Sequence, residues 1–368
     1  MIHYWLVNNR GGEKFLAELA DLFPDADLFT HVYNAKKVPP KINLLNVSTT
    51  FINRLPFAAK LYQSYFPLMP LALQTLNLKG YDLIISTESG PAKGICKPKG
   101  SMHICCCFTP MRYLWDMSDE YYESASLPKK AGMKLLLPAL RKWDIWSATQ
   151  VDYFIAISEF VADRILQVYG RESIIIYPPV DTERFSVIER DPQDFYLCFG
   201  QLTAYKRANL AIEAFSRTGK RLVIAGTGDE SKRLKAAASK NVEFLGRVSE
   251  DQLDKLYSTC RALIFPGIED FGMVPVEAQA AGAPVIAFRG GGALETVIEN
   301  KTGIFFNKQS ADSLIEAVEK FEKMQFDPLI CRQQAKKFSP DNFRIQFLSL
   351  LKNLQKDKNC PVKIDLNQ

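Results

Sequence analysis

Residues 261–288 read RALIFPGIEDFGMVPVEAQAAGAPVIAF and contain a complete strand–loop–helix–strand unit. The apolar run 262–265 predicts a buried strand, residues 274–281 predict a helix, and residues 285–288 predict a second buried strand. A helix that joins two such strands is typical of a parallel sheet covered by helices on both faces. The stretch therefore indicates an α/β protein.

The same alternation extends along the chain in both directions. The sequence predicts further strands at 2–7, 81–86, 102–108, 153–157, 174–176, 196–199, 222–225 and 242–245. Because a domain holds about 100–200 residues, 368 residues suggest two domains. The polar stretch 180–194, which contains Pro192, separates two strand–helix series. We therefore predict domains at 1–190 and 191–340, followed by a C-terminal helix and tail at 341–368 whose amphipathic face docks back on the first domain.

Composition narrows the class of protein. Hydrophobic residues make up 47% and charged residues 24%, which is ordinary for a globular protein, and the formal net charge of +5 is too small to argue for nucleic acid. The eight cysteines form no C-x-x-C pair, which fits a reducing cytoplasm. No signal peptide is apparent, and the uncharged segment 61–78 is too rich in Pro, Gln and Asn for a membrane span. We expect a cytoplasmic protein.

The loop between the strand 262–265 and the next helix carries the strongest chemical signal. The backbone N–H groups of Phe271, Gly272 and Met273 stand at a helix start, where the helix dipole favours an anion such as a diphosphate. Glu277, placed in the first helical turn, is suited to two adjacent ribose hydroxyls, and Glu269 in the loop is suited to a sugar hydroxyl. The alternative is that Glu277 only caps the helix and that Glu269 is a solvated loop charge.

This stretch resembles the E-x7-E signature of the retaining GT-B glycosyltransferases of family 4. Further segments resemble the same family: WLVNNRGGEKFL (5–16), TESGPAKG (87–94), FTPMRYLWD (108–116), YFIAISEFVADRI (153–165), YPPVDTERF (177–185) and FGQLTAYKRANLAIEAF (199–215). They are most similar to a mannosyltransferase-like branch that acts in bacterial surface-polysaccharide synthesis. The resemblance implies two Rossmann-like domains that face each other across a cleft, an acceptor-binding first domain and a donor-binding second domain.

On the donor side, the resemblance assigns Lys206 to the donor diphosphate. A cation there stabilises the charge that grows on the leaving phosphate, whereas a cation at a helix start without a ligand is slightly unfavourable. Family members often have Arg where this chain has Gln201, and Arg207 is a candidate substitute. The alternative is that Lys206 and Arg207 are two surface charges.

The resemblance also assigns two backbone segments to the donor. Gly11 and Gly12, expected between the first strand and the first helix, allow close approach to the donor phosphates and sugar, although a plain tight turn is an alternative. Arg247 and Val248 align with the segment that flanks the nucleobase.

On the acceptor side, Phe108 stands where related sequences often have His. His103 lies at an odd offset from it in one strand, so we interpret His103 as structural. Arg112, Trp115 and Asp116 are the acceptor-side candidates. Trp115 is suited to stacking on a sugar ring, with a core aromatic as the alternative.

Neither a metal nor another cofactor is expected. The D-x-D triplet of Asp25 and Asp27 falls in a predicted turn far from the phosphate loops, and the chain has only three His residues. A basic and aromatic region, interrupted by Pro138, is suited to an anionic membrane, with a solvated surface as the alternative. It comprises Lys129, Lys130, Lys134, Arg141, Lys142, Trp143 and Trp146.

These patterns and the resemblance predict a retaining hexosyltransferase at the inner face of the membrane. Its expected donor is GDP-mannose, and its expected acceptor is a saccharide or lipid-linked saccharide. Two alternatives remain: a sugar-nucleotide epimerase of the same fold, and a non-catalytic sugar-nucleotide-binding subunit.

Overall fold

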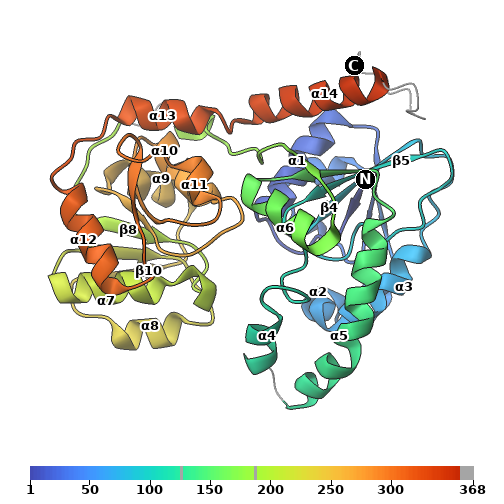
Figure 1. Cartoon of the computed structure of the whole chain (residues 1–368), viewed down its shortest axis with the longest axis horizontal. Helices are drawn as coiled ribbons and strands as arrows, with labels where there is room; N and C mark the ends of the chain where they lie inside the picture. The colour runs from blue at the N-terminus through green and yellow to red at the C-terminus, as the bar shows by residue number, and fades with distance from the viewer. Residues whose placement is uncertain (125–126, 186–188, 357–368) are drawn as a thin grey trace. The chain divides into compact units, whose positions relative to one another are not determined.

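The computed structural model describes residues 1–124, 127–185 and 189–356 (Figure 1). Internal contacts divide the chain into two compact units. Unit 1 comprises Met1–Pro178 together with the segment from Phe343 onward, and unit 2 comprises Pro179–Asn342. The change at Pro178 lies ahead of the predicted boundary at 190, at the Pro178-Pro179 pair that ends the first strand–helix series.

Unit 1 is built on a parallel sheet that has seven strands within the described residues, in the order β3-β2-β1-β4-β5-β6-β7. The strands are β1 (Ile2–His3), β2 (Asp27–Thr30), β3 (Asn46–Thr49), β4 (Leu83–Glu88), β5 (Met102–Cys107), β6 (Tyr153–Ala156) and β7 (Ser173–Ile175). Every residue of β5, MHICCC, is buried, as expected for a strand that is covered on both faces.

The helices of unit 1 are α1 (Gly11–Leu22), α2 (Ala58–Leu61), α3 (Met69–Gln74), α4 (Ser118–Ser124), α5 (Leu127–Ala148) and α6 (Glu159–Tyr169), and the C-terminal helix α14 (Pro340–Lys356) returns to this unit. Figure 1 shows α14 above α1. The ring of Phe343 meets that of Phe15 at 4.9 Å between centroids, and Arg344 donates to Glu18 at 2.6 Å. The predicted docking of the amphipathic C-terminal helix on the first domain is thus observed.

Unit 2 repeats the plan with strands in the order β10-β9-β8-β11-β12-β13. The strands are β8 (Tyr196–Phe199), β9 (Leu222–Ala225), β10 (Val242–Gly246), β11 (Leu263–Phe265), β12 (Val285–Phe288) and β13 (Gly303–Phe306). The helices are α7 (Ala208–Thr218), α8 (Ser231–Ala237), α9 (Glu250–Thr259), α10 (Met273–Ala280), α11 (Ala293–Thr296), α12 (Ala311–Phe321) and α13 (Pro328–Lys336). Helices α7, α8 and α12 share one core cluster with the strands. Strands β11 and β12 pair in parallel, with Leu263 opposite Val285, which confirms the strand–loop–helix–strand prediction for residues 261–288.

Two local predictions were wrong. Gly11 and Gly12 are the first two residues of α1, not loop residues, because the Glu13 carboxylate accepts from the Arg10 N–H at 2.9 Å and starts the helix early. The basic region is one continuous helix, α5, through Pro138. The carbonyl that a proline leaves unpaired belongs to the residue four positions earlier, Lys134, and this residue is exposed.

No helix in the described ranges combines the length and the apolar character that crossing a membrane requires. The rejected span 61–78 is broken into a 3-10 helix, Tyr62–Leu68, and the short α3.

Candidate active site

The loop between β11 and α10 is held in one conformation by close packing. Gly272 caps α10 at φ +90°, a conformation that disfavours other residues. Phe271 is buried and meets the ring of Phe338 edge-on at 5.3 Å. The N–H of Gly292 donates to the Glu269 carbonyl at 2.9 Å, and a Cβ on Gly292 would lie 2.3 Å from the Phe271 backbone. The first N–H groups of α10, which have no intrahelical acceptor, are therefore fixed in place.

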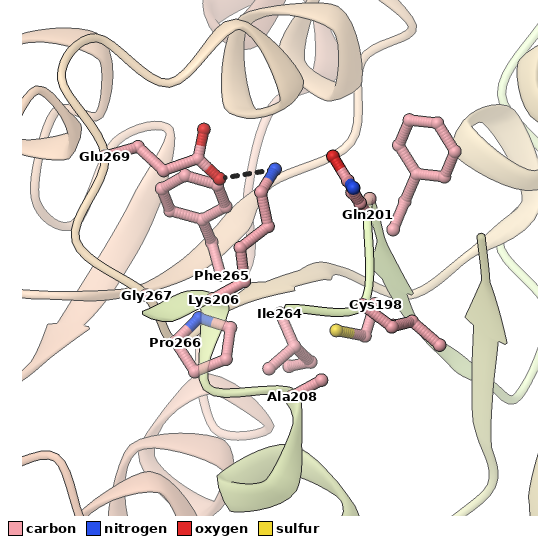
Figure 2. Close-up of a pocket in the computed structure, with 12 residues that line it drawn as sticks. Cys198, Gln201, Lys206, Ala208, Ile264, Phe265, Pro266, Gly267 and Glu269 are labelled. Atoms are coloured by element: carbon pink, nitrogen blue, oxygen red, sulfur yellow. Dashed lines mark ion pairs between the residues drawn. The ribbon is translucent and has the colours of Figure 1, made fainter. Parts of the chain in front are cut away.

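Lys206 and Glu269 form an ion pair at 2.9 Å in a hollow that Gln201 also lines (Figure 2). Their side chains are only 18% and 19% exposed. Lys206 ends a 3-10 turn, Ala204–Lys206, just after β8. Burial lowers the pKa of Lys206, but the Glu269 carboxylate more than offsets this, so its pKa lies above the ordinary value. Lys206 is therefore a cation at neutral pH, and it is neither a free surface charge nor a distant neighbour of Glu269.

Glu277 is the fifth residue of α10, so its predicted place in the first turn was wrong. The helix is capped by Gly272 and has no acidic residue in its first turn, which excludes the capping role for Glu277. The hydroxyl of the buried Tyr257, on α9, donates to Glu277 Oε2 at 2.9 Å. Tyr257 thus orients this carboxylate, and no spacing in the sequence pointed to that partner.

The other donor-side predictions of unit 2 do not line the hollow of Lys206 and Glu269. Arg207 is exposed at the N-cap of α7 with φ +54°. Arg247 and Val248 follow β10 and line a different hollow, of about 380 Å³, with Leu245 and Leu256.

Gly12 has a packing role within unit 1. A Cβ there would lie 2.7 Å from Tyr4 Oη and 3.2 Å from the Phe108 ring. Phe108 also meets the Phe15 ring at 5.0 Å, so it belongs to an aromatic cluster.

The acceptor-side candidates make contacts within unit 1. The Trp115 indole N–H donates to Asp144 Oδ2 at 2.7 Å, and the Arg141 guanidinium lies 5.5 Å from the Trp115 ring centroid. Asp116 pairs with Arg164 at 2.5 Å, and Arg112 Nη1 lies 3.5 Å from Met117 Sδ. Trp115 is half-buried, so its ring is anchored at one edge and partly open to solvent.

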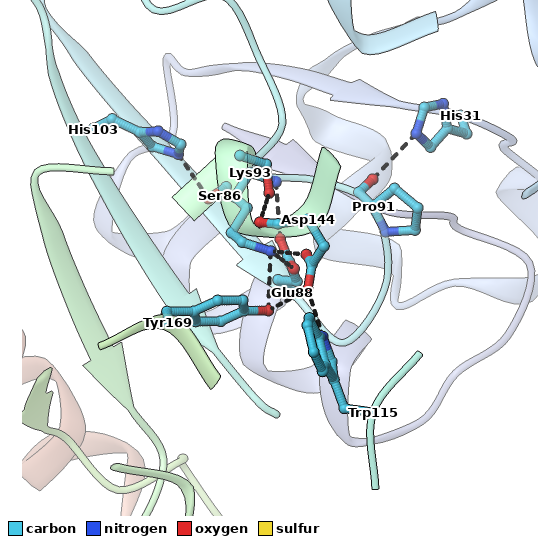
Figure 3. A network of polar contacts seen from close by, with 10 residues as sticks. His31, Ser86, Glu88, Pro91, Lys93, His103, Trp115, Asp144 and Tyr169 are labelled. Carbon is cyan, nitrogen blue, oxygen red and sulfur yellow. Dashed lines mark hydrogen bonds and ion pairs between the residues drawn. The ribbon is translucent and has the colours of Figure 1, made fainter. Parts of the chain in front are cut away.

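Asp144 belongs to a buried charge network that the sequence analysis missed (Figure 3). Lys93 Nζ lies 2.6 Å from Glu88 and 2.5 Å from Asp144, and all three side chains are fully buried. The Tyr169 hydroxyl donates to Asp144 at 3.0 Å. Burial raises the pKa of Glu88. Burial also lowers the pKa of Lys93, but the two neighbouring carboxylates outweigh this effect and raise the Lys93 pKa well above its usual value. The segment TESGPAKG contains Glu88 and Lys93, but nothing in the sequence indicated Asp144 as their partner.

His103 is buried, with Nε2 at 2.8 Å from Ser86 Oγ and Nδ1 at 2.9 Å from the Gln150 carbonyl. Burial lowers its pKa to about 4. Both ring nitrogens of His103 have polar partners within unit 1, which agrees with the interpretation of His103 as a structural residue.

Among the described residues, no three His, Cys, Asp or Glu side chains are grouped so that they could hold a metal ion. Asp25 lies in a turn, whereas Asp27 is the first residue of β2 rather than a loop residue. Asp27 accepts from Asn46 at 2.6 Å and also from the Tyr81 hydroxyl. These contacts tie its carboxylate to the sheet.

Two family models match the chain. The model of Glycosyltransferase Family 4 matches residues 9–184, and the model described as Glycosyl transferases group 1 matches residues 179–338. The two matches cover both units almost from end to end.

Curated relatives match over part of the chain. An alpha-1,3/1,6-mannosyltransferase of Dictyostelium discoideum is 31% identical over 179 residues, which cover 41% of this chain and 42% of that protein. A GDP-mannose-dependent alpha-(1-6)-phosphatidylinositol monomannoside mannosyltransferase of Mycobacterium tuberculosis is 29% identical over 196 residues, covering 44% and 50%. The chain spans about half, or less, of the length of these relatives.

A solved structure matches over nearly the whole chain. Anabaena HepE, in complex with UDP and glucose, superimposes with a TM-score of 0.67 over 95% of this chain and 99% of that one, at 18% identity. This likeness shows a shared fold and confirms the predicted fold class.

Proposed function

The chain belongs to the glycosyltransferases of family 4, and from this premise we propose that it is a retaining hexosyltransferase. We propose GDP-mannose as the donor and a saccharide or lipid-linked saccharide of bacterial surface-polysaccharide synthesis as the acceptor. The observation that carries the proposal is the hollow of unit 2, where Lys206 and Glu269 face each other beside the loop that opens α10. The names of the mannosyltransferase relatives support the choice of donor.

In the proposed reaction the bond from the hexose C1 to the diphosphate oxygen breaks. The acceptor hydroxyl oxygen bonds to C1 on the same face, and its proton passes to the leaving phosphate oxygen. Negative charge grows on that phosphate, so the Lys206 ammonium and the N–H groups at the start of α10 contribute most as the bond breaks. When the donor binds, before the bond breaks, Glu269 exchanges its contact with Lys206 for a hydroxyl of the hexose.

The experiment that tests this proposal has two stages. GDP- and UDP-sugars are screened for thermal stabilisation of the full chain, and the best donor is then tested for turnover with lipid-linked acceptors. Transfer with GDP-mannose supports the proposal. Epimerisation of the donor without an acceptor would favour the epimerase, and stabilisation without any turnover would favour the binding subunit.

Glu277→Ala should weaken donor binding by about 1–3 kcal/mol, because charge-assisted hydrogen bonds to the ribose are lost. Tyr257→Phe should cause a smaller loss, since it keeps the carboxylate and removes only its 2.9 Å orienting bond. Titration calorimetry with GDP measures both. Glu213→Ala, an exposed glutamate on α7, is the control. Unchanged GDP affinity in Glu277→Ala would remove Glu277 from the site.

Activity should survive chelation by EDTA. Lys206 and the start of α10 supply the positive charge that a metal ion would otherwise bring to the diphosphate. The measurement is the transfer rate before and after EDTA treatment. A loss of activity that manganese or magnesium restores would refute the metal-free mechanism and return attention to Asp25 and Asp27.

We further propose that the enzyme works in the cytoplasm, at the inner face of the membrane, because a lipid-linked acceptor is held there. Such a position requires a surface of the protein that binds anionic lipid.

A further inference from the structure

The segment 51–74 of unit 1 is apolar on two sides. It runs through a 3-10 turn (Phe51–Arg54), α2, the 3-10 helix Tyr62–Leu68 and α3. Its inward side chains, Ile52, Ala58, Met69 and Ala72, join a core cluster with Val7 and Val32. Its outward side includes Phe57, Leu61, Leu68 and Leu71, which are 73%, 44%, 42% and 59% exposed. A surface helix of a globular protein normally turns polar residues outward, and this segment departs from that pattern.

The charges in this part of the sequence all have one sign, although Lys41 is paired with Asp21 of α1. Residues 28–81 contain no Asp and no Glu, whereas their cations are Lys36, Lys37, Lys41, Arg54, Lys60 and Lys79. Arg54 and Lys60 are exposed within the apolar segment itself. The exposed apolar side chains match the apolar interior of a lipid bilayer, and the positive charges match negatively charged headgroups. An anionic bilayer combines both properties.

The backbone at Phe57 supports this interpretation. Its φ of +52° is left-handed, a conformation that bulky residues rarely adopt. Phe57 precedes α2, and its ring remains 73% exposed although the core cluster is formed by residues on both sides of it. The ring therefore buries little of its surface in the folded protein alone.

The basic and aromatic region of α5 is divided: Lys134, Lys142 and Trp146 are exposed, whereas Trp143 and Arg141 pack within unit 1. Trp143 packs so closely on Gly94 that a Cβ there would lie 2.1 Å from the indole. Arg141 donates to the Leu114 carbonyl at 2.6 Å and to Ser118 Oγ at 3.0 Å. These side chains are engaged within unit 1.

We propose that residues 54–71 form an interfacial membrane-binding surface. Phe57, Leu61, Leu68 and Leu71 enter the headgroup region of an anionic bilayer, and Arg54 and Lys60 contact its phosphates. The role of this surface depends on the proposed function, because the surface would bring the enzyme to a lipid-linked acceptor. Lipid binding itself is measured independently of transfer.

The test is sedimentation of the full chain with vesicles of equal parts phosphatidylcholine and phosphatidylglycerol, beside vesicles of phosphatidylcholine alone. The wild type should bind the anionic vesicles more tightly, and added salt should weaken this binding. The double variant Phe57→Ser/Leu71→Ser should bind at least about tenfold more weakly, because two large apolar side chains lose their burial in the bilayer. Lys60→Glu should weaken binding roughly fivefold to tenfold.

Matched controls lie on unit 2. Leu329→Ser, which changes a side chain 63% exposed on α13, and Lys308→Glu should bind vesicles as the wild type does. Stabilisation by GDP-mannose, measured on every variant, should not change, so a failure of lipid binding is distinguished from a failure of the donor site. The proposal is overturned if the wild type ignores anionic vesicles or if the Phe57→Ser/Leu71→Ser variant binds normally. It is also overturned if that variant changes the oligomeric state in size-exclusion chromatography, which would assign the face to a second copy of the chain.

Discussion

Lys206→Ala should lower kcat for sugar transfer by about 100-fold or more, the cost of removing one preorganised electrostatic group from a developing charge. The reason is differential stabilisation: the attraction between the ammonium and the diphosphate strengthens as the glycosidic bond breaks, so kcat falls more than donor affinity. Lys206→Arg should rescue only part of the rate, because a planar guanidinium does not replace a compact ammonium in a hollow where a Cβ on Gly200 would already lie 3.1 Å from Lys206 Nζ.

Because Lys206 forms an ion pair with Glu269, the stability of the Lys206→Ala variant must be measured beside its activity. An exposed cation at a helix start would add little stability, but the Lys206 side chain is only 18% exposed and neutralises a carboxylate. Lys206→Ala should therefore also lower Tm, and activity must be measured well below the melting transition. The double variant Lys206→Ala/Glu269→Gln removes the unpaired carboxylate and should recover Tm without recovering kcat. Wild-type turnover in a folded Lys206→Ala variant would show that Lys206 takes no part in bond cleavage.

Lys93→Met should destabilise the protein by about 3–5 kcal/mol, the usual cost of removing one partner from a buried ion pair. The methionine fills a similar volume, but it leaves Glu88 and Asp144 as two fully buried carboxylates without their cation. Because the network holds two carboxylates and one ammonium, Glu88→Gln should cost less than Lys93→Met, since it reduces the excess negative charge instead of increasing it.

Urea unfolding at neutral pH measures these differences. Lys97→Met is the matched control, because Lys97 pairs with Asp152 at 2.6 Å while both side chains remain partly exposed, 26% and 34%. A pair of that kind contributes about 1 kcal/mol or less. Equal losses in Lys93→Met and Lys97→Met would mean that the buried network does not hold unit 1 together.

The parts of the fold that follow from local pattern could be predicted from the sequence. Apolar runs such as 262–265 and 285–288 have to be buried strands, and the helix between them requires parallel pairing. The amphipathic spacing of Phe343 and Phe347 predicted a docked C-terminal helix, and Phe343 does pack on Phe15.

Contacts between distant residues could not be predicted in this way. Asp144 reaches Lys93 from another element, and Tyr257 orients Glu277 from α9, because the topology of each sheet brings these elements together. Local competition decided the two wrong element boundaries. The hydrogen bond from the Arg10 N–H to the Glu13 carboxylate outweighed the low helix propensity of Gly11 and Gly12, and α5 continues through Pro138 beside the exposed Lys134.

A crystal structure of the full chain with GDP-mannose bound would locate the donor. We expect the diphosphate between Lys206 Nζ and the first N–H groups of α10, the ribose hydroxyls on Glu277, and Glu269 turned from Lys206 to the hexose. A nucleotide bound away from these residues, for example beside Asp25 and Asp27, would refute the proposed donor site.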